Sequence, residues 1–243
     1  MTTFIYNGHD LADILDVAKI EMPAMAPAAP TVRDVPGMDG AAYCGTRMEP
    51  MEIRVRARLA TCSTEPAEIQ RQWARVAALL RSDEPAPLTL APGLYRMAVL
   101  QGASDLEFYS YSAIAELSFL CPDPVAYGDE RTVTVPSGGS ATFNVAGTYP
   151  AKPVIEAASA VRDGSSLVWG VRLDAGDVLQ VATGSESARK VVLDCAARTC
   201  AVAGATALPT LASDWFELAP GDHTIENHLG SGACTVAFRE RWV

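Results

Sequence analysis

The stretch Ser118–Glu130, SFLCPDPVAYGDE, interrupts the chain near its middle and separates two halves of different character. An apolar strand pattern runs as far as Cys121 and is followed at once by Pro122 and Pro124. Each proline removes a backbone donor that a sheet would use and biases the preceding residue toward extended conformations. We therefore interpret CPDPVAYG as a connection between two domains, with residues 1–128 forming the first and residues 129–243 the second.

The strand predicted over residues 51–59, MEIRVRARL, alternates strictly between apolar and polar side chains. A period of two places one face of this strand in a core and the other in solvent. Arg54, Arg56 and Arg58 follow one another along the outer face, which is unusual in a chain with a formal net charge of -10. One interpretation of this row is a solvated edge that discourages strand addition, and the other is a stripe that binds a partner subunit.

One main helix is predicted in the first half, beginning near Pro66, where a missing N–H costs nothing. An apolar stripe follows at helical spacing, formed by Ile69, Trp73, Val76 and Leu80. Pro85 and Pro87 end the helix, and strand patterns resume from residue 88 to residue 121. The first domain is therefore predicted to be α+β, with the helix packed on a sheet. The proline-rich segment 24–30 cannot be a central strand, and with residues 31–40 it forms a long connection or an extended arm.

The second half contains no convincing helix and many short strand patterns separated by turn signals such as Asp163-Gly164 and Pro220-Gly221. Short strands at even spacing are typical of a β-sandwich or jelly roll. Three tryptophans, Trp169, Trp215 and Trp242, fall in this half. We expect them to fill the core, and the alternative is an exposed face on which an aromatic ring stacks against sugars.

Bulk properties exclude several classes of function. The length of 243 residues, 49% of them hydrophobic, is enough for one large or two modest cores. The acidic surface disfavours specific nucleic-acid binding. The N-terminus lacks the features of a signal peptide, and no stretch approaches the roughly 18 apolar residues needed to cross a bilayer. Folding in a reducing cytoplasm is expected, so the six cysteines are interpreted as small buried hydrophobes, with a Cys195–Cys200 disulfide less favoured.

Catalytic and metal-binding signatures are weak. The three histidines are His9, in a predicted polar turn, and His223 and His228, which flank a predicted strand on opposite faces and make a poor metal site. Aspartates beside glycines, such as Asp163 and Asp174, are more typical of turn capping than of a glycosidase pair. We therefore assign no catalytic, cofactor-binding or metal-binding residue from the sequence.

Several segments in order along the chain resemble the distal tail (Dit) proteins of long, non-contractile-tailed phages. In the first half these are FIYNGHDL (4–11), DVPGMDG (34–40) and SFLCPDPVAYG (118–128). In the second half they are GTYPAKPVIE (147–156), VVLDC (191–195), WFELAPGDHTI (215–225) and RERW (239–242). The chain departs from the family pattern where His223 and Thr224 occupy the neighbourhood of a frequent asparagine, which bears on the turn there and not on the fold.

The resemblance implies a structural protein of the virion tail, without cofactors, assembled in the host bacterial cytoplasm. Its first domain would form a hexameric belt and its second a galectin-like β-sandwich. The ring would contact tail tube protein on one side and a tail-associated baseplate protein on the other. The tape measure protein and later DNA would pass through its lumen, and an acidic lumen would let DNA slide. In that setting Arg54, Arg56 and Arg58 are candidate subunit-interface residues. The alternatives are a carbohydrate-binding module without catalysis and a hydrolase that uses paired turn carboxylates.

Overall fold

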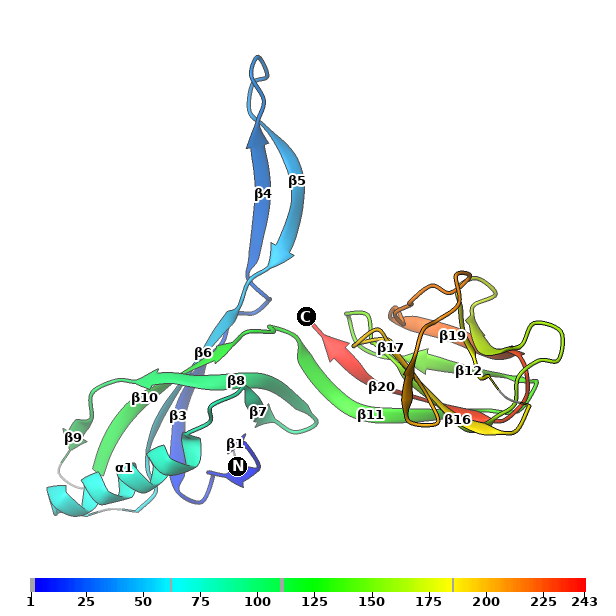
Figure 1. Ribbon diagram of the computed structural model, residues 1–243. Helices are drawn as coiled ribbons and strands as arrows, with labels where there is room; N and C mark the ends of the chain where they lie inside the picture. Colours follow the sequence, from blue (N-terminus) through cyan, green and yellow to red (C-terminus); the bar gives the residue numbers. More distant parts are fainter. Residues whose placement is uncertain (1–2, 62, 110–111, 185) are drawn as a thin grey trace. The chain divides into compact units, whose positions relative to one another are not determined.

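The computed structural model describes residues 3–61, 63–109, 112–184 and 186–243 (Figure 1). The chain divides into two compact units, Met1–Tyr127 with Val243, and Gly128–Trp242. Each unit has a separate hydrophobic core of its own. The first unit contains the helix and the second consists of strands, so the predicted α+β domain followed by an all-β sandwich-like domain is confirmed.

The first unit is built on an antiparallel sheet in the order β8-β10-β6-β3. The bounds of these strands are Leu94–Ala103, Ser112–Cys121, Met51–Leu59 and Leu15–Glu21. Strand β7 (Ala86–Ala91) pairs with β8, β1 (Ile5–Tyr6) joins β7 to β2 (His9–Asp10), and β9 (Glu107–Tyr109) pairs with β10. Every second residue of β6 is buried, as its alternating sequence predicts.

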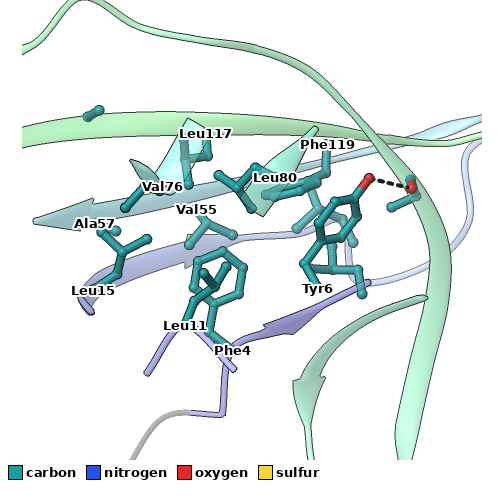
Figure 2. Packing of buried hydrophobic residues seen from close by; sticks show 14 of the residues in the cluster. Phe4, Tyr6, Leu11, Leu15, Val55, Ala57, Val76, Leu80, Leu117 and Phe119 are labelled. Carbon is teal, nitrogen blue, oxygen red and sulfur yellow. Dashed lines mark hydrogen bonds between the residues drawn. The ribbon is translucent and has the colours of Figure 1, made fainter. Parts of the chain in front are cut away.

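Helix α1 (Pro66–Leu80) contributes an apolar stripe to the core of the first unit. Its buried residues are the four predicted ones, Ile69, Trp73, Val76 and Leu80. Figure 2 shows Val76 and Leu80 among side chains of β6 and β10 and of the N-terminal segment, and Tyr6 donates a hydrogen bond to the Ala98 carbonyl at 3.2 Å. In the part of the chain that the structure describes, no helix is both long and apolar enough to cross a membrane.

The last three residues of the proline-rich segment begin an arm, which we define as the hairpin of β4 (Ala28–Asp34) and β5 (Ala41–Met48). These two strands make a separate two-stranded sheet, and Figure 1 shows the hairpin extending from the first unit between β3 and β6. The turn is supplied by residues 35–40, where Gly37 and Gly40 have positive φ angles. Of the two alternatives drawn from the sequence, the extended arm is the one that the structure contains.

The second unit contains two antiparallel sheets. One has the strand order β18-β17-β16-β13-β20-β11, and the other has the order β12-β19-β14-β15. The bounds of the first set are Ala205–Ala207, Thr199–Val202, Arg189–Asp194, Val154–Ala160, Cys234–Trp242 and Ala126–Val135. Those of the second set are Ser140–Val145, Gly221–Leu229, Val168–Leu173 and Val178–Ala182. Inward-facing residues of both sheets form one core.

The central interruption is shorter than its sequence suggests. Strand β11 already begins at Ala126, so the prediction that the connection extends to Gly128 is wrong for its last three residues. Pro122 and Pro124 each lack a backbone N–H, so they prevent strand pairing only at their own positions. Beyond them Val125 and Ala126 are buried, and Tyr127 stacks on Tyr95 with ring centroids 5.5 Å apart. This burial favours an immediate return to strand.

The tryptophans of the second unit differ in their surroundings. Trp169 is fully buried in the core, and Trp215 is partly buried against it. Trp242, the last residue of β20, is half-buried and lies outside that core cluster. The prediction of core packing therefore holds for Trp169, holds in part for Trp215 and is wrong for Trp242, which follows the last inward-facing residues of its strand.

Candidate interaction surfaces

The arginine row lies on the outer face of the first unit's sheet, and each arginine has a countercharge from the same chain. Arg54 Nε lies 3.0 Å from Glu52 and 3.9 Å from Glu116. Arg56 pairs with Glu107 at 3.0 Å, and Arg58 pairs with Asp16 at 3.1 Å. The partners come from β6 itself and from the strands β3, β9 and β10 around it. Sequence alone could place the arginines on one face but could not identify these neighbours.

The strengths of these pairs are modest because all of the side chains are exposed. The hydrogen bond from Arg54 lowers the pKa of Glu52, and the positive charge of Arg54 lowers it further. The same hydrogen bond raises the pKa of Arg54. Exposed ion pairs of this kind contribute about 0–1 kcal/mol. The row therefore stabilises the fold little, and its arginines can exchange their carboxylate partners at small cost.

Two shallow hollows lie on either side of Arg54 on this outer face. One, of about 420 Å³, is lined by Glu52, Arg54, Glu116, Ser118 and residues 101–104. The other, of about 650 Å³, reaches the base of the arm at Pro27 and Pro50. The first is predominantly polar, and the second combines charged side chains with prolines. Hollows this open suit contact with another macromolecule better than enclosure of a small ligand.

The arm is the most apolar exposed feature of the first unit. Its strands face each other with Val32 directly opposite Tyr43, and these side chains are 60% and 66% exposed. Other exposed large apolar residues in and beside the arm are Met22, Met25, Val35 and Met38. Several exposed large apolar side chains on one element make the arm a candidate interface. The turn signals Pro36-Gly37 and Asp39-Gly40 lie between its two strands and are the part of this hairpin that the sequence indicates.

Two of the histidines lie within one strand of the second unit. His223 and His228 are both in β19 rather than flanking it, and His9 lies in the short strand β2 rather than in a turn. His228 Nε2 is in contact with the Arg172 guanidinium. Among the residues that the structure describes, no group of three or more His, Cys, Asp or Glu side chains could hold a metal ion.

His223 connects three segments of the second unit. Its Nδ1 lies 2.6 Å from Asp174 Oδ2, in the turn between β14 and β15. Its Nε2 lies 2.7 Å from the carbonyl oxygen of Ala219, which precedes β19. Asp174 Oδ1 also accepts the backbone N–H of Thr224 at 2.7 Å. No signal in the sequence pairs Asp174 with His223, because 49 residues separate them.

The cysteines are thiols wherever the structure describes them. Cys121, Cys195, Cys200 and Cys234 are buried, as expected, whereas Cys44 is exposed on the arm, contrary to expectation. Cys62 lies outside the described residues. Cys195 and Cys200 are both free, so the less favoured disulfide is not formed. Burial raises the pKa of Cys195 to about 12.

Comparison with known proteins accounts for both units. Residues 9–121 match the family described as phage tail protein RIFT-related domain, and residues 146–242 match the siphovirus-type tail component, C-terminal domain. The distal tail protein of Bacillus phage SPP1 is 26% identical over 258 residues, which cover 99% of this chain and 96% of that protein. The chain belongs to the distal tail protein family.

Two solved phage structures share the fold. The crystal structure of the SPP1 Dit protein superposes with a TM-score of 0.83 at 20% identity and covers 100% of both chains. A chain of the phage p2 baseplate in its activated conformation superposes with a TM-score of 0.52 at 10% identity, over 98% of each chain. This member of the distal tail family is therefore a structural component of a phage tail, and the carbohydrate-binding alternative is not favoured.

Proposed function

We propose that the chain assembles with copies of itself into a closed hexameric ring at the distal end of a phage tail, and that it has no catalytic activity. In this proposal residues 1–128 are the belt domain and residues 129–243 the galectin-like sandwich domain. The observation that carries this proposal is the arm, because its exposed Val32–Tyr43 pair lies in a sheet of only two strands. An isolated hairpin is marginally stable in water, so a neighbouring surface that covers it stabilises it.

A ring of identical subunits needs a head-to-tail interface in which one surface binds a different surface of the next copy. The arm supplies one such surface. The arginine row is the candidate for the other, since Arg54, Arg56 and Arg58 can exchange their exposed carboxylate partners for those of a neighbour. The arm also carries carboxylates, at Asp34 and Asp39, beside its apolar residues.

The ring would join tail tube protein to a tail-associated baseplate protein, with the tape measure protein and then DNA passing through the lumen. Assembly would take place in the bacterial cytoplasm. A chain of net charge -10 gives phosphate backbones little to adhere to.

The test is the mass of the full chain in solution, measured by light scattering over a wide range of concentrations. The wild type is expected to form a hexamer as concentration rises. A Val32→Ser/Tyr43→Ser variant should remain monomeric, because it loses the apolar surface of the arm without touching either core. The matched control is Leu208→Ser/Leu211→Ser, which removes two exposed apolar side chains of the second unit and should assemble like the wild type.

A second variant, Arg54→Gln/Arg56→Gln/Arg58→Gln, tests the arginine row without adding negative charge. Weaker assembly is expected, with a concentration midpoint raised about tenfold or more. Unchanged assembly of this variant would remove the arginines from the interface and leave the arm as its centre. Assembly of the Val32→Ser/Tyr43→Ser variant at wild-type concentrations would refute the role of the arm.

A further inference from the structure

The hydrogen bonds of His223 fix its protonation state. Both groups that its ring nitrogens meet, the Asp174 carboxylate and the Ala219 carbonyl, can only accept hydrogen bonds. The carboxylate is ionised at neutral pH, because burial raises its pKa less than the hydrogen bonds of Thr224 and His223 lower it, and the pKa lies below its usual 3.8. Both ring nitrogens must therefore donate, so His223 is an imidazolium in this geometry. Only 10% of the His223 side chain is exposed, whereas 45% of the Asp174 side chain is exposed.

One of the two bonds joins distant parts of the sequence, since Asp174 is 49 residues from His223, whereas Ala219 is only four residues away. Asp174 and Ala175 form a tight turn with φ angles of 47° and 57°, and the Asp174 N–H donates to the Thr224 carbonyl at 2.9 Å. Ala219 lies near the end of the long irregular segment 208–220. This segment carries the exposed side chains of Leu208 and Leu211. The imidazolium thus fastens both the turn and the end of this apolar segment to β19.

We propose that His223 is a pH-sensitive clip in the sandwich, which bonds the 174–176 turn and the end of the 208–220 segment to β19 at the same time when protonated and loses one of these two bonds when neutral. A neutral imidazole has one N–H, so it can donate to Asp174 or to Ala219 but not to both. Loss of the proton therefore leaves one of the two acceptors without its donor from His223.

The charged groups around the ring favour the protonated form. Burial lowers the pKa of His223, but the hydrogen bonds to Asp174 and Ala219 and the charges of Asp174 and Asp222 together outweigh it and raise the pKa above its usual 6.5. Asp174 belongs to the turn, and Asp222 lies on β19 itself. Strand β12, which pairs with β19, faces His223 with the Phe143 ring, 6.3 Å away between centroids, and has no ionisable side chain.

The pH range in which the clip holds follows from the pKa shifts of His223 and Asp174. Because the pKa of His223 is raised on folding, its contribution to stability is complete below 6.5 and is lost as the pH rises through the folded value. Burial raises the pKa of Asp174, but the Thr224 N–H and His223 together lower it below its usual 3.8. Its contribution is therefore lost as the pH falls through that lower value. The clip holds between these two limits.

The first test is a two-bond ¹H–¹⁵N NMR titration of the imidazole rings in the full chain. The three histidines are assigned from the His223→Gln and His228→Gln variants. His223 is expected to be an imidazolium at pH 6.5 and to titrate with a midpoint above its usual value of 6.5. A neutral ring at pH 6, or a midpoint at or below 6.5, would overturn the proposal even if a variant failed to fold.

The second test is hydrogen exchange, with measured rates divided by the intrinsic rates at each pH. Protection of residues 172–178 and 214–224 in the wild type should fall about tenfold between pH 6 and pH 9, the scale of one hydrogen bond from a charged donor. In His223→Gln the protection should be low and independent of pH, whereas the matched control His228→Gln should behave like the wild type. Protection that does not change with pH in the wild type, or changes equally in His223→Gln, would contradict the clip.

Discussion

The reactivity of each cysteine thiol depends on whether its side chain is buried in a core or exposed. Burial raises the pKa of Cys121 and of Cys234 to about 11 and that of Cys195 to about 12. The reactive thiolate is therefore scarce at neutral pH in these three residues, and their sulfur atoms are also inaccessible. Cys44, on the arm, is exposed.

Alkylation should reveal this difference. In a Cys62→Ser background, iodoacetamide at pH 8 is expected to modify Cys44 within minutes and to leave the four buried cysteines unmodified until the chain is unfolded in guanidinium. Peptide mass spectrometry reads each site separately. Rapid modification of Cys195 or Cys234 in the folded protein would show that the sandwich core is more open than the structure indicates.

The sequence pattern predicts the face of a strand on which a side chain lies better than it predicts the residues that the side chain contacts. The period of two in MEIRVRARL was sufficient to place Arg54, Arg56 and Arg58 outside and Ile53 and Val55 inside. It contained no information on Asp16 or Glu107, because those carboxylates arrive from strands that pair at distant positions in the chain. The contact of Asp174 with His223 was hidden for the same reason.

Single elements were predictable where a strong local signal coincided with burial. Helix α1 begins at Pro66, and its apolar stripe is the one that faces the core. The arm was predicted only as one of two alternatives, since its proline-rich first strand has low β propensity. The early start of β11 was missed because the contacts that stabilise Ala126 and Tyr127, such as the Tyr95 ring, lie elsewhere in the sequence.

The helix offers a direct test of how much one buried side chain stabilises the first unit. Trp73 is 8% exposed and belongs to the core cluster. Trp73→Ala is expected to lower the free energy of unfolding by about 3–5 kcal/mol, the range for removing a large buried aromatic side chain. Denaturant unfolding measures the change, with exposed Arg75→Ala on the same helix as the control. A loss below 1 kcal/mol would mean that the helix packs loosely.

At the scale of the whole molecule, the two cores share no residues. We therefore predict that fragments 1–127 and 128–243 fold when expressed separately, because each retains its own sheet and its own buried apolar surface. Circular dichroism and amide NMR spectra of each fragment provide the measurement, with the spectra of the full chain as reference. Dispersed amide resonances in one fragment alone would show that the other unit depends on its neighbour.

The exposed arm has a consequence for how the proposed ring would grow. If each copy gives one arm and receives one, every open chain of copies ends in an arm that nothing covers and a receiving surface that stays empty. Only closure satisfies both ends at once. Partial assemblies would therefore be scarce at equilibrium, and the population would divide between single copies and complete circles.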